Sequence, residues 1–256
     1  MTSPPGKRRF ATWLIVGVLA SSPAQALAGE VVVAVASNFA SVAEVLADRF
    51  EAESDHAVTL VAGSTGKLYA QIVRGAPFDV FLAADSLRPG RLVSEGRAVE
   101  GSRRVYALGR LRLWSGETDG VASLGPEGLS SGEFRHLAIA NPALAPYGVA
   151  AHQVLQTLAL EERLEGRLVF GENIGQTYAL VASGNAELGL VAASQLVAAG
   201  ASSAGWLVPR SHHAPIRQEG VLLSRAEDLE AAQAFLSFLA SDDARRLIEA
   251  AGYEVP

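Results

Sequence analysis

The side chains best suited to chemistry in this 256-residue sequence are small hydroxyls and amides at four short turns. Ser37-Asn38 is the first, and the others are 63–66 (Gly-Ser-Thr-Gly), 145–148 (Ala-Pro-Tyr-Gly) and 173–176 (Asn-Ile-Gly-Gln). Such turns supply neutral hydrogen-bond donors and a backbone that can approach a ligand closely. Each turn alone is explained equally well by helix capping or chain reversal. Their coincidence indicates a binding site for a group rich in hydrogen-bond acceptors.

A nucleophilic serine is the main alternative chemistry. Ser64 lies in a sequence that resembles a nucleophile elbow, although the first glycine of that motif is absent. Asp85 or Asp119, with His212 or His213, would have to complete a triad, and no spacing selects among them. The sequence therefore favours a binding protein over a serine hydrolase, and we expect no enzyme activity.

Phosphate-loop and metal-site patterns are incomplete. The dipeptide Gly66-Lys67 is typical of a phosphate loop, but that motif needs glycine where Val61 stands and Ser or Thr where Leu68 stands. The five histidines have no metal-site spacing, and the sequence contains no cysteine for thiolate ligands or disulfides. We expect no cofactor and no metal held directly by protein side chains.

The first 28 residues have the features of a secretory signal peptide. Three basic residues at 7–9 precede an apolar run over 10–20, and the segment ends with Ala-Leu-Ala at 26–28. That run has 11 residues, whereas a helix needs about 20 to cross a bilayer. We expect cleavage before Gly29 and release into the periplasm, with the general secretory and twin-arginine routes both open.

Cleavage would change the formal net charge from −6 to −9. An acidic surface repels nucleic acids and anionic lipids, so an anionic ligand would need strictly local attraction. Hydrophobic residues make up 49% of the sequence, enough to fill one large domain or two lobes in the remaining 228 residues. We expect a soluble monomer that does not bind nucleic acid.

The elements that would position the four turns alternate between strands and helices. In the first half we predict strands over 30–36, 57–62 and 79–83, a helix over 41–53 that begins with a capping box of Ser41 and Glu44, and a helix carrying Leu68 and Ile72. In the second half we predict strands over 136–140, 167–170 and 187–191, with helices beginning near Pro146, Asn173 and Ala193. Ligands of such parallel sheets bind beyond the carboxyl ends of the strands.

Two segments are expected to cross between lobes. Residues 105–114 are long for one strand, and 216–223 is predicted to return before two helices over 229–251. The predicted fold class is α/β, with two lobes that are each a mostly parallel sheet flanked by helices, and with two hinge crossings. We place the first lobe at 29–109 and 217–256 and the second at 110–216.

Several motifs resemble the periplasmic molybdate-binding proteins of ABC transporters. They are 36–39 (Ala-Ser-Asn-Phe), 63–72 (Gly-Ser-Thr-Gly-Lys-Leu-Tyr-Ala-Gln-Ile), 75–81 (Gly-Ala-Pro-Phe-Asp-Val-Phe), Asn141-Pro142, 145–148, 172–176 and 251–253. The resemblance covers essentially the whole chain after residue 28. It implies a type II periplasmic-binding-protein fold whose lobes close over the anion, and a membrane ABC permease as partner.

The resemblance also implies which groups hold molybdate, and tungstate with it. Hydrogen bonds would come from Ser37, Asn38, Ser64, Thr65 and Tyr147, and from the backbone N–H of Ile174. A dianion has only acceptors, so neutral donors suit it without a full counter-charge; Lys67 is interpreted as a solvated helix residue. Sulfate is the alternative oxyanion. Phosphate is disfavoured because it carries a proton at neutral pH, which needs an acceptor that this set does not contain.

Overall fold

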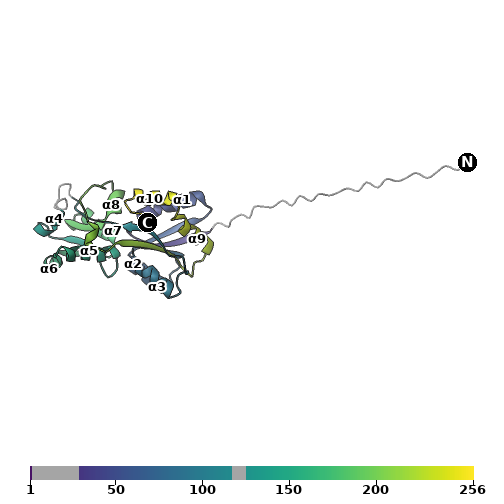
Figure 1. The fold of residues 1–256 in the computed structure, drawn as a ribbon, viewed down its shortest axis with the longest axis horizontal. Helices are drawn as coiled ribbons and strands as arrows, with labels where there is room; N and C mark the ends of the chain where they lie inside the picture. The colour runs from purple at the N-terminus through teal and green to yellow at the C-terminus, as the bar shows by residue number, and fades with distance from the viewer. Residues whose placement is uncertain (2–28, 117–124) are drawn as a thin grey trace.

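Two five-stranded sheets, each flanked by helices, form two lobes (Figure 1). The computed structural model describes residues 29–116 and 125–256 together with Met1. The predicted signal peptide and the candidate residue Asp119 therefore lie outside the described residues. Within the described ranges, no helix is long and apolar enough to cross a membrane.

The first lobe is built on the sheet β2-β1-β3-β10-β4. Its strands are β1 (Glu30–Ala36), β2 (Ala57–Gly63), β3 (Val80–Ala83), β4 (Arg104–Gly109) and β10 (Ile216–Leu222). Its helices are α1 (Ala40–Glu53), α2 (Thr65–Val73), α3 (Leu87–Ser94), α9 (Leu229–Phe238) and α10 (Asp242–Ala250). Helices α1, α9 and α10 cover one face of this sheet, and α2 and α3 cover the other (Figure 1).

The second lobe is built on the sheet β7-β6-β8-β5-β9. Its strands are β5 (Leu111–Trp114), β6 (Leu137–Ala140), β7 (Leu168–Gly171), β8 (Leu188–Ala192) and β9 (Trp206–Leu207). Its helices are α4 (Pro126–Ser131), α5 (Pro146–Thr157), α6 (Glu161–Leu164), α7 (Ile174–Ala182) and α8 (Ala193–Ala198), with short 3₁₀ turns at Glu165–Arg167 and Arg210–His212.

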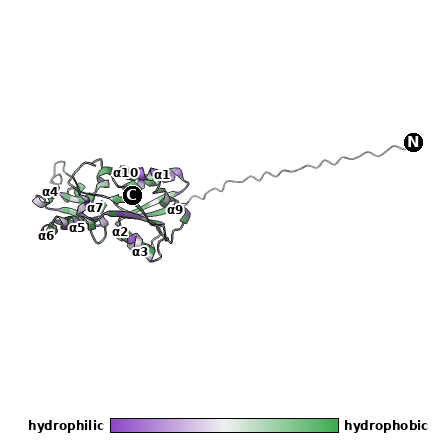
Figure 2. Ribbon diagram, viewed as in Figure 1, coloured by the Kyte–Doolittle hydropathy of each residue, from purple (hydrophilic) through white to green (hydrophobic). Residues whose placement is uncertain are grey.

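Apolar side chains on the central strands explain why the helices pack where they do. Every residue of β3, β6 and β8 is buried, as expected of strands covered on both faces. In the first lobe, Phe50 of α1 meets Phe235 of α9 edge-on, with ring centroids 5.3 Å apart. Figure 2 shows much of the hydrophobic colour on the strands of the two lobes.

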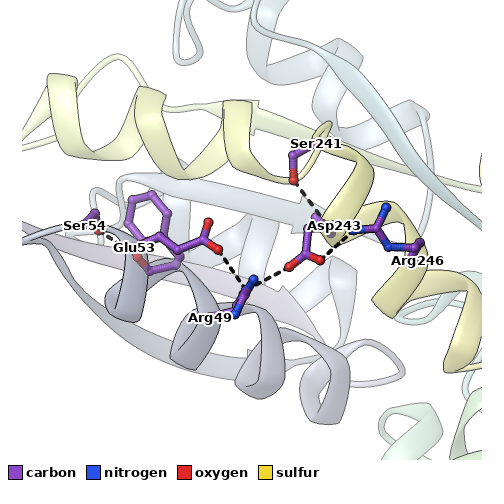
Figure 3. A network of polar contacts seen from close by, with 8 residues as sticks. Arg49, Glu53, Ser54, Ser241, Asp243 and Arg246 are labelled. Atoms are coloured by element: carbon purple, nitrogen blue, oxygen red, sulfur yellow. Dashed lines mark hydrogen bonds and ion pairs between the residues drawn. The ribbon is translucent and has the colours of Figure 1, made fainter.

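Helix α10 is tied to α1 by ion pairs at the surface (Figure 3). Arg49 Nε lies 2.9 Å from Glu53 and 2.8 Å from Asp243, and Arg246 lies 2.9 Å from the second oxygen of Asp243. The side chain of Ser241 caps α10 by accepting a hydrogen bond from the Ala244 N–H. Arg246 and Arg49 hold the pKa of the Asp243 carboxyl below its usual value.

Two sequence-based expectations differ from the structure. The sheets are mixed rather than mostly parallel, because β10 runs antiparallel to β3 and β4, and β5 runs antiparallel to β8 and β9. The segment 105–114 does cross between the lobes as predicted, as two strands that separate at Arg110. The capping box of Ser41 and Glu44 is wrong, because α1 begins at Ala40 and Ser41 already lies inside the helix.

Candidate functional site

The four predicted turns meet at the interface between the two lobes. A Cβ atom added to Gly175 in the second lobe would lie 3.9 Å from Ser37 Oγ in the first. The Gly66 N–H donates a 2.9 Å hydrogen bond to the Leu144 carbonyl, which joins the second turn to the third. Ala36 and Ala84 share one apolar cluster with residues of the second lobe. The structure is therefore a closed arrangement of the lobes.

Ser37 and Asn38 follow β1 and present two donors that the protein does not use. The Ser37 N–H donates to the Gly63 carbonyl at 2.9 Å. In the described part of the chain, the Ser37 hydroxyl and the Asn38 backbone N–H have no hydrogen-bond partner. Ser37 is half-buried, so its hydroxyl is accessible to a small ligand.

The side chain of Asn38 is already occupied. Its Nδ2 donates to Gln218 Oε1 at 2.7 Å and to the Tyr253 hydroxyl at 3.0 Å. Its backbone carbonyl accepts from the Tyr253 hydroxyl at 2.6 Å and from Ser194 Oγ at 3.2 Å. Asn38 can therefore offer a ligand its backbone N–H but not its amide, which holds the loop after β1 in place.

Ser64 and Thr65 open helix α2 and are both buried. Ser64 is the N-cap, and its Oγ accepts from the Lys67 N–H at 3.4 Å. Thr65 Oγ1 accepts from the Ala84 N–H at 3.1 Å and so links α2 to the end of β3. Both hydroxyls act as acceptors in these bonds, which leaves their protons available for a ligand at the positive end of the helix dipole.

Tyr147 is the second residue of α5, after Pro146 in the first turn. Its ring is almost fully buried. No partner among the described residues meets its hydroxyl with the distance and angles of a normal hydrogen bond. The hydroxyl lies next to Gly109, where an added Cβ would come within 2.2 Å of it. Burial raises the pKa of Tyr147 well above its usual value. The hydroxyl therefore stays protonated, but it is enclosed beside Gly109. The backbone N–H of Tyr147, which has no acceptor among the described residues, is the donor that remains free at this helix end.

Ile174 is the first residue of α7, and its backbone N–H points out of the helix end. Asn173 caps this helix through Oδ1, which accepts from the Gln176 N–H at 2.9 Å. The Ile174 N–H has no acceptor in the part of the chain that the structure describes. The helix end therefore keeps an unpaired N–H near Ser37, as the turn at 173–176 predicted.

Lys67 has a partner that the sequence did not reveal. Its Nζ lies 2.6 Å from Glu172 Oε2 across the lobe interface, with both side chains about half exposed. Lys67 is a half-exposed residue of α2, as predicted, and the ion pair is an addition to that prediction. Because its charge is paired with a carboxylate at the surface, the interior of the interface relies on neutral donors.

The hydrolase candidates do not come together. The hydrogen bond that Ser64 Oγ makes among the described residues is to the Lys67 backbone. Asp85 pairs with Arg88, and His213 Nδ1 lies 2.7 Å from the carbonyl of Ala214. Over the described ranges, no group of three or more His, Asp or Glu residues is placed to hold a metal ion.

A groove of about 480 Å³ opens between the lobes next to these turns. Residues 84–88 line it from the first lobe, and Pro146 and Val149 line it from the second. Sequence reasoning missed the polar residues behind the site, chiefly Gln218 and Ser194. The available signal was Gln218 in the strand predicted to cross back between the lobes, where an amide that is buried needs polar partners.

Comparisons with known proteins agree with this architecture. Residues 31–254 match the family of bacterial extracellular solute-binding proteins. The chain is 45% identical over 247 residues, 96% of each protein, to the molybdate-binding protein ModA of Azotobacter vinelandii. It is 43% identical over 228 residues, 89% of each, to ModA of Rhodobacter capsulatus. The solved periplasmic molybdate-binding protein of Azotobacter vinelandii matches with a TM-score of 0.85 and 40% identity, over 88% of this chain and 99% of that one.

Proposed function

The chain belongs to the bacterial extracellular solute-binding proteins, and from that premise we propose that it captures molybdate between its lobes and delivers it to a membrane ABC permease. Two relatives with 45% and 43% identity are molybdate-binding proteins. The observation that carries the proposal is the convergence of unpaired backbone N–H groups and free hydroxyl protons from both lobes on one closed interface. The proposed donors are the hydroxyls of Ser37, Ser64 and Thr65 and the backbone N–H groups of Asn38, Tyr147 and Ile174.

Hydrogen bonds from these neutral donors can account for the free energy of binding a dianion. A hydrogen bond to a charged group contributes about 1.5–3 kcal/mol. The six proposed donors would together contribute about 9–18 kcal/mol, and most of this range exceeds the ~8–11 kcal/mol of micromolar to nearly nanomolar binding and leaves a margin for desolvation and closure. The N-termini of α2, α5 and α7 add favourable dipoles without adding a titratable charge.

The ligand range follows from the same donors. Tungstate has the same charge and nearly the same size as molybdate, so we propose it as a second ligand. Sulfate is also a dianion but is smaller, and it would leave some of the donors too far away. Phosphate brings a proton at neutral pH, and the proposed donor set contains no carboxylate to accept it.

The proposal extends to processing and domain boundaries. We propose that residues 1–28 are removed on export, that the product acts in the periplasm as a monomer, and that it binds without a cofactor and catalyses no reaction. The first lobe would comprise 29–109 and 217–256, and the second 110–216. The separation of the two sheets at Arg110 supports the first of these boundaries.

A panel of anions tests the function directly. Protein beginning at Gly29 would be melted with molybdate, tungstate, sulfate, phosphate and a simple carboxylate, and positive ligands titrated by calorimetry. A bound ligand raises the melting temperature according to its affinity and concentration. We expect large shifts with molybdate and tungstate and small ones with the others. A larger shift with sulfate than with molybdate would identify sulfate as the ligand. Hydrolysis of simple esters by the wild type, lost in Ser64→Ala, would support a serine hydrolase instead.

A further inference from the structure

Three consecutive residues at the start of α8 donate hydrogen bonds to carbonyls of three different segments. The first N–H of the helix donates to the Arg110 carbonyl at 2.9 Å, where the chain passes from one sheet to the other. Ser194 Oγ donates to the Asn38 carbonyl at 3.2 Å. Gln195 Nε2 donates to the Ile174 carbonyl at 3.0 Å. Since Asn38 and Ile174 carry proposed backbone donors from opposite lobes, the start of α8 contacts both sides of the site and the crossing between them.

The contact that Ser194 makes with Asn38 crosses the lobe interface and is buried. Ser194 is 6% exposed, and Asn38 is 5% exposed. The Tyr253 hydroxyl lies 2.9 Å from Ser194 Oγ and 2.6 Å from the Asn38 carbonyl, so the three residues form one polar cluster. Asn38 and Tyr253 belong to the first lobe, whereas Ser194 is carried by α8 of the second. The cluster is therefore completed only when the lobes are closed.

The first-lobe part of this cluster is complete without Ser194. The Tyr253 hydroxyl donates to the Asn38 carbonyl and accepts from Asn38 Nδ2 at 3.0 Å. Loss of the Ser194 hydroxyl would therefore leave the buried polar groups of Asn38 and Tyr253 with partners. The Ser194 hydrogen bond adds to closure but is not needed to satisfy the first lobe.

The orientation of the Gln195 amide follows from its two neighbours. Its Oε1 accepts from the Ala192 N–H at 3.0 Å, and its Nε2 faces the Ile174 carbonyl. The reverse orientation would set donor against donor and acceptor against acceptor. Ile174 is the first residue of α7, so this bond holds the helix end that carries the free N–H. Both residues lie in the second lobe, and we expect the bond to persist when the lobes separate.

We propose that Ser194 and Gln195 are positioning residues of the anion site. Gln195 holds the first turn of α7 from within the second lobe, and Ser194 engages the Asn38 carbonyl as the lobes close. Because the two residues are adjacent on one helix, the backbone N–H donors of Asn38 and Ile174 are brought to a fixed separation. In this proposal neither side chain contacts the anion. The proposal rests on the proposed function, because it assigns a role to the supports of the molybdate donors.

Ser194→Ala tests the contact made on closure. We expect molybdate affinity, measured by calorimetry, to fall about threefold to tenfold, the scale of one neutral hydrogen bond. Protein-bound molybdenum should be released faster on dilution by a similar factor, because the lost bond forms only after closure. Urea unfolding of the ligand-free protein should be unchanged, since no buried group loses its partner.

Ser203→Ala is the matched control, because Ser203 is exposed and its hydroxyl has no hydrogen bond among the described residues. It should match the wild type in affinity, release and unfolding. Wild-type affinity in Ser194→Ala would overturn the role of Ser194. A loss of affinity that is accompanied by an equal loss of ligand-free stability would overturn it as well, because it would indicate a structural role.

A second variant, Gln195→Met, tests the amide. Methionine is similar in size but lacks both the donor and the acceptor, so the Ala192 N–H also loses its partner and the ligand-free protein should unfold at lower urea. Positioning of Ile174 predicts in addition that the folded protein binds molybdate about threefold to tenfold more weakly. Wild-type affinity in folded Gln195→Met would show that the amide only caps α8 and would overturn its role. Wild-type protein that binds no molybdate in the same titration would overturn the proposed function, and this proposal with it.

Discussion

Ser37 and Thr65 are two hydroxyl residues of the proposed site that differ in the hydrogen bonds they make within the protein. The Ser37 hydroxyl bonds to nothing in the described structure, whereas Thr65 Oγ1 satisfies the buried N–H of Ala84 at 3.1 Å. Removal of a hydroxyl that has no protein partner affects only the ligand. Removal of one that satisfies a buried N–H affects folding as well. The two positions therefore allow binding to be separated from stability.

Ser37→Ala should weaken molybdate binding by about 1.5–3 kcal/mol, roughly tenfold to more than a hundredfold. Its unfolding free energy should stay within about 0.5 kcal/mol of wild type, because no protein hydrogen bond is lost. Calorimetric titration and urea unfolding measure the two quantities. Ser203→Ala is the matched control for both, because Ser203 is exposed and its hydroxyl has no hydrogen bond among the described residues. Unchanged affinity in Ser37→Ala would remove Ser37 from the site.

Thr65→Ala should lower both quantities. It leaves the Ala84 N–H buried without a partner, which costs about 1–3 kcal/mol of stability, and it deletes one proposed ligand donor. Thr65→Ser retains the hydroxyl and is the matched control, with affinity close to wild type. If Thr65→Ala is destabilised but its folded fraction binds molybdate normally, the hydroxyl serves only to join α2 to β3.

Among the elements, β6 and β8 are joined at their amino ends by a carboxylate that accepts two hydrogen bonds. Glu187 lies directly before β8 and accepts from Arg135 Nε at 2.8 Å and from the His136 N–H at 3.0 Å. Chiefly through the Arg135 hydrogen bond, the pKa of Glu187 is lowered to about 2. A lowered pKa in the folded state stabilises the protein above the unfolded pKa of about 4.3. This stabilisation is lost as the pH falls through about 2.

Glu187→Gln should therefore destabilise the protein near pH 7 and have a shrinking effect as the pH falls from 4.5 toward 2. The loss near pH 7 should be about 1 kcal/mol or less, because the side chain is 36% exposed and solvent screens the pair. Urea unfolding at several pH values gives the difference. Glu133→Gln, another exposed carboxylate nearby in sequence, is the control. A difference of constant size from pH 7 to pH 2 would contradict the ion pair as its cause.

For the whole molecule, the ion pair between Lys67 and Glu172 joins the lobes at the surface of the interface. It forms only when the lobes are closed, but its exposure limits its contribution to about 1 kcal/mol. Lys67→Ala should therefore reduce molybdate affinity by no more than about fivefold, and less at high salt. The charge swap Lys67→Glu with Glu172→Lys should restore it. A loss of a hundredfold in Lys67→Ala would instead place the lysine charge at the anion.

Closure itself should be visible in solution. Because the proposed donors come from both lobes, molybdate favours the closed arrangement, and the β4–β5 and β10 crossings are expected to bend when it leaves. Small-angle scattering should give a smaller radius of gyration with saturating molybdate than without it. A chain with Ser37→Ala and Thr65→Ala together should compact less at the same ligand concentration. Identical radii with and without bound ligand would contradict a closing cleft.

Local sequence patterns determined most of the secondary structure and the positions of the polar turns. Short apolar runs identified the main strands, because strands covered on both faces bury every residue, and period-3.6 apolar patterns identified helices with one buried face. Turns of small polar residues after strands marked the helix ends where unpaired N–H groups would face a ligand. Asn173 shows this well: its side chain caps α7 and leaves the Ile174 N–H free, both consequences of short-range geometry.

The tertiary structure alone decided which polar groups remain free for a ligand. Asn38 and Ser37 are both polar residues of the first turn, and the sequence gives no reason to separate their roles. In the structure the Asn38 side-chain amide is bound by Gln218 and Tyr253, 180 and 215 residues away along the chain. Lys67 likewise meets Glu172 across 105 residues. Such pairs depend on how two sheets are oriented and how closely the lobes approach. Periodicity records only which face of an element is buried, and not the partner on the other side, so these assignments required the folded chain.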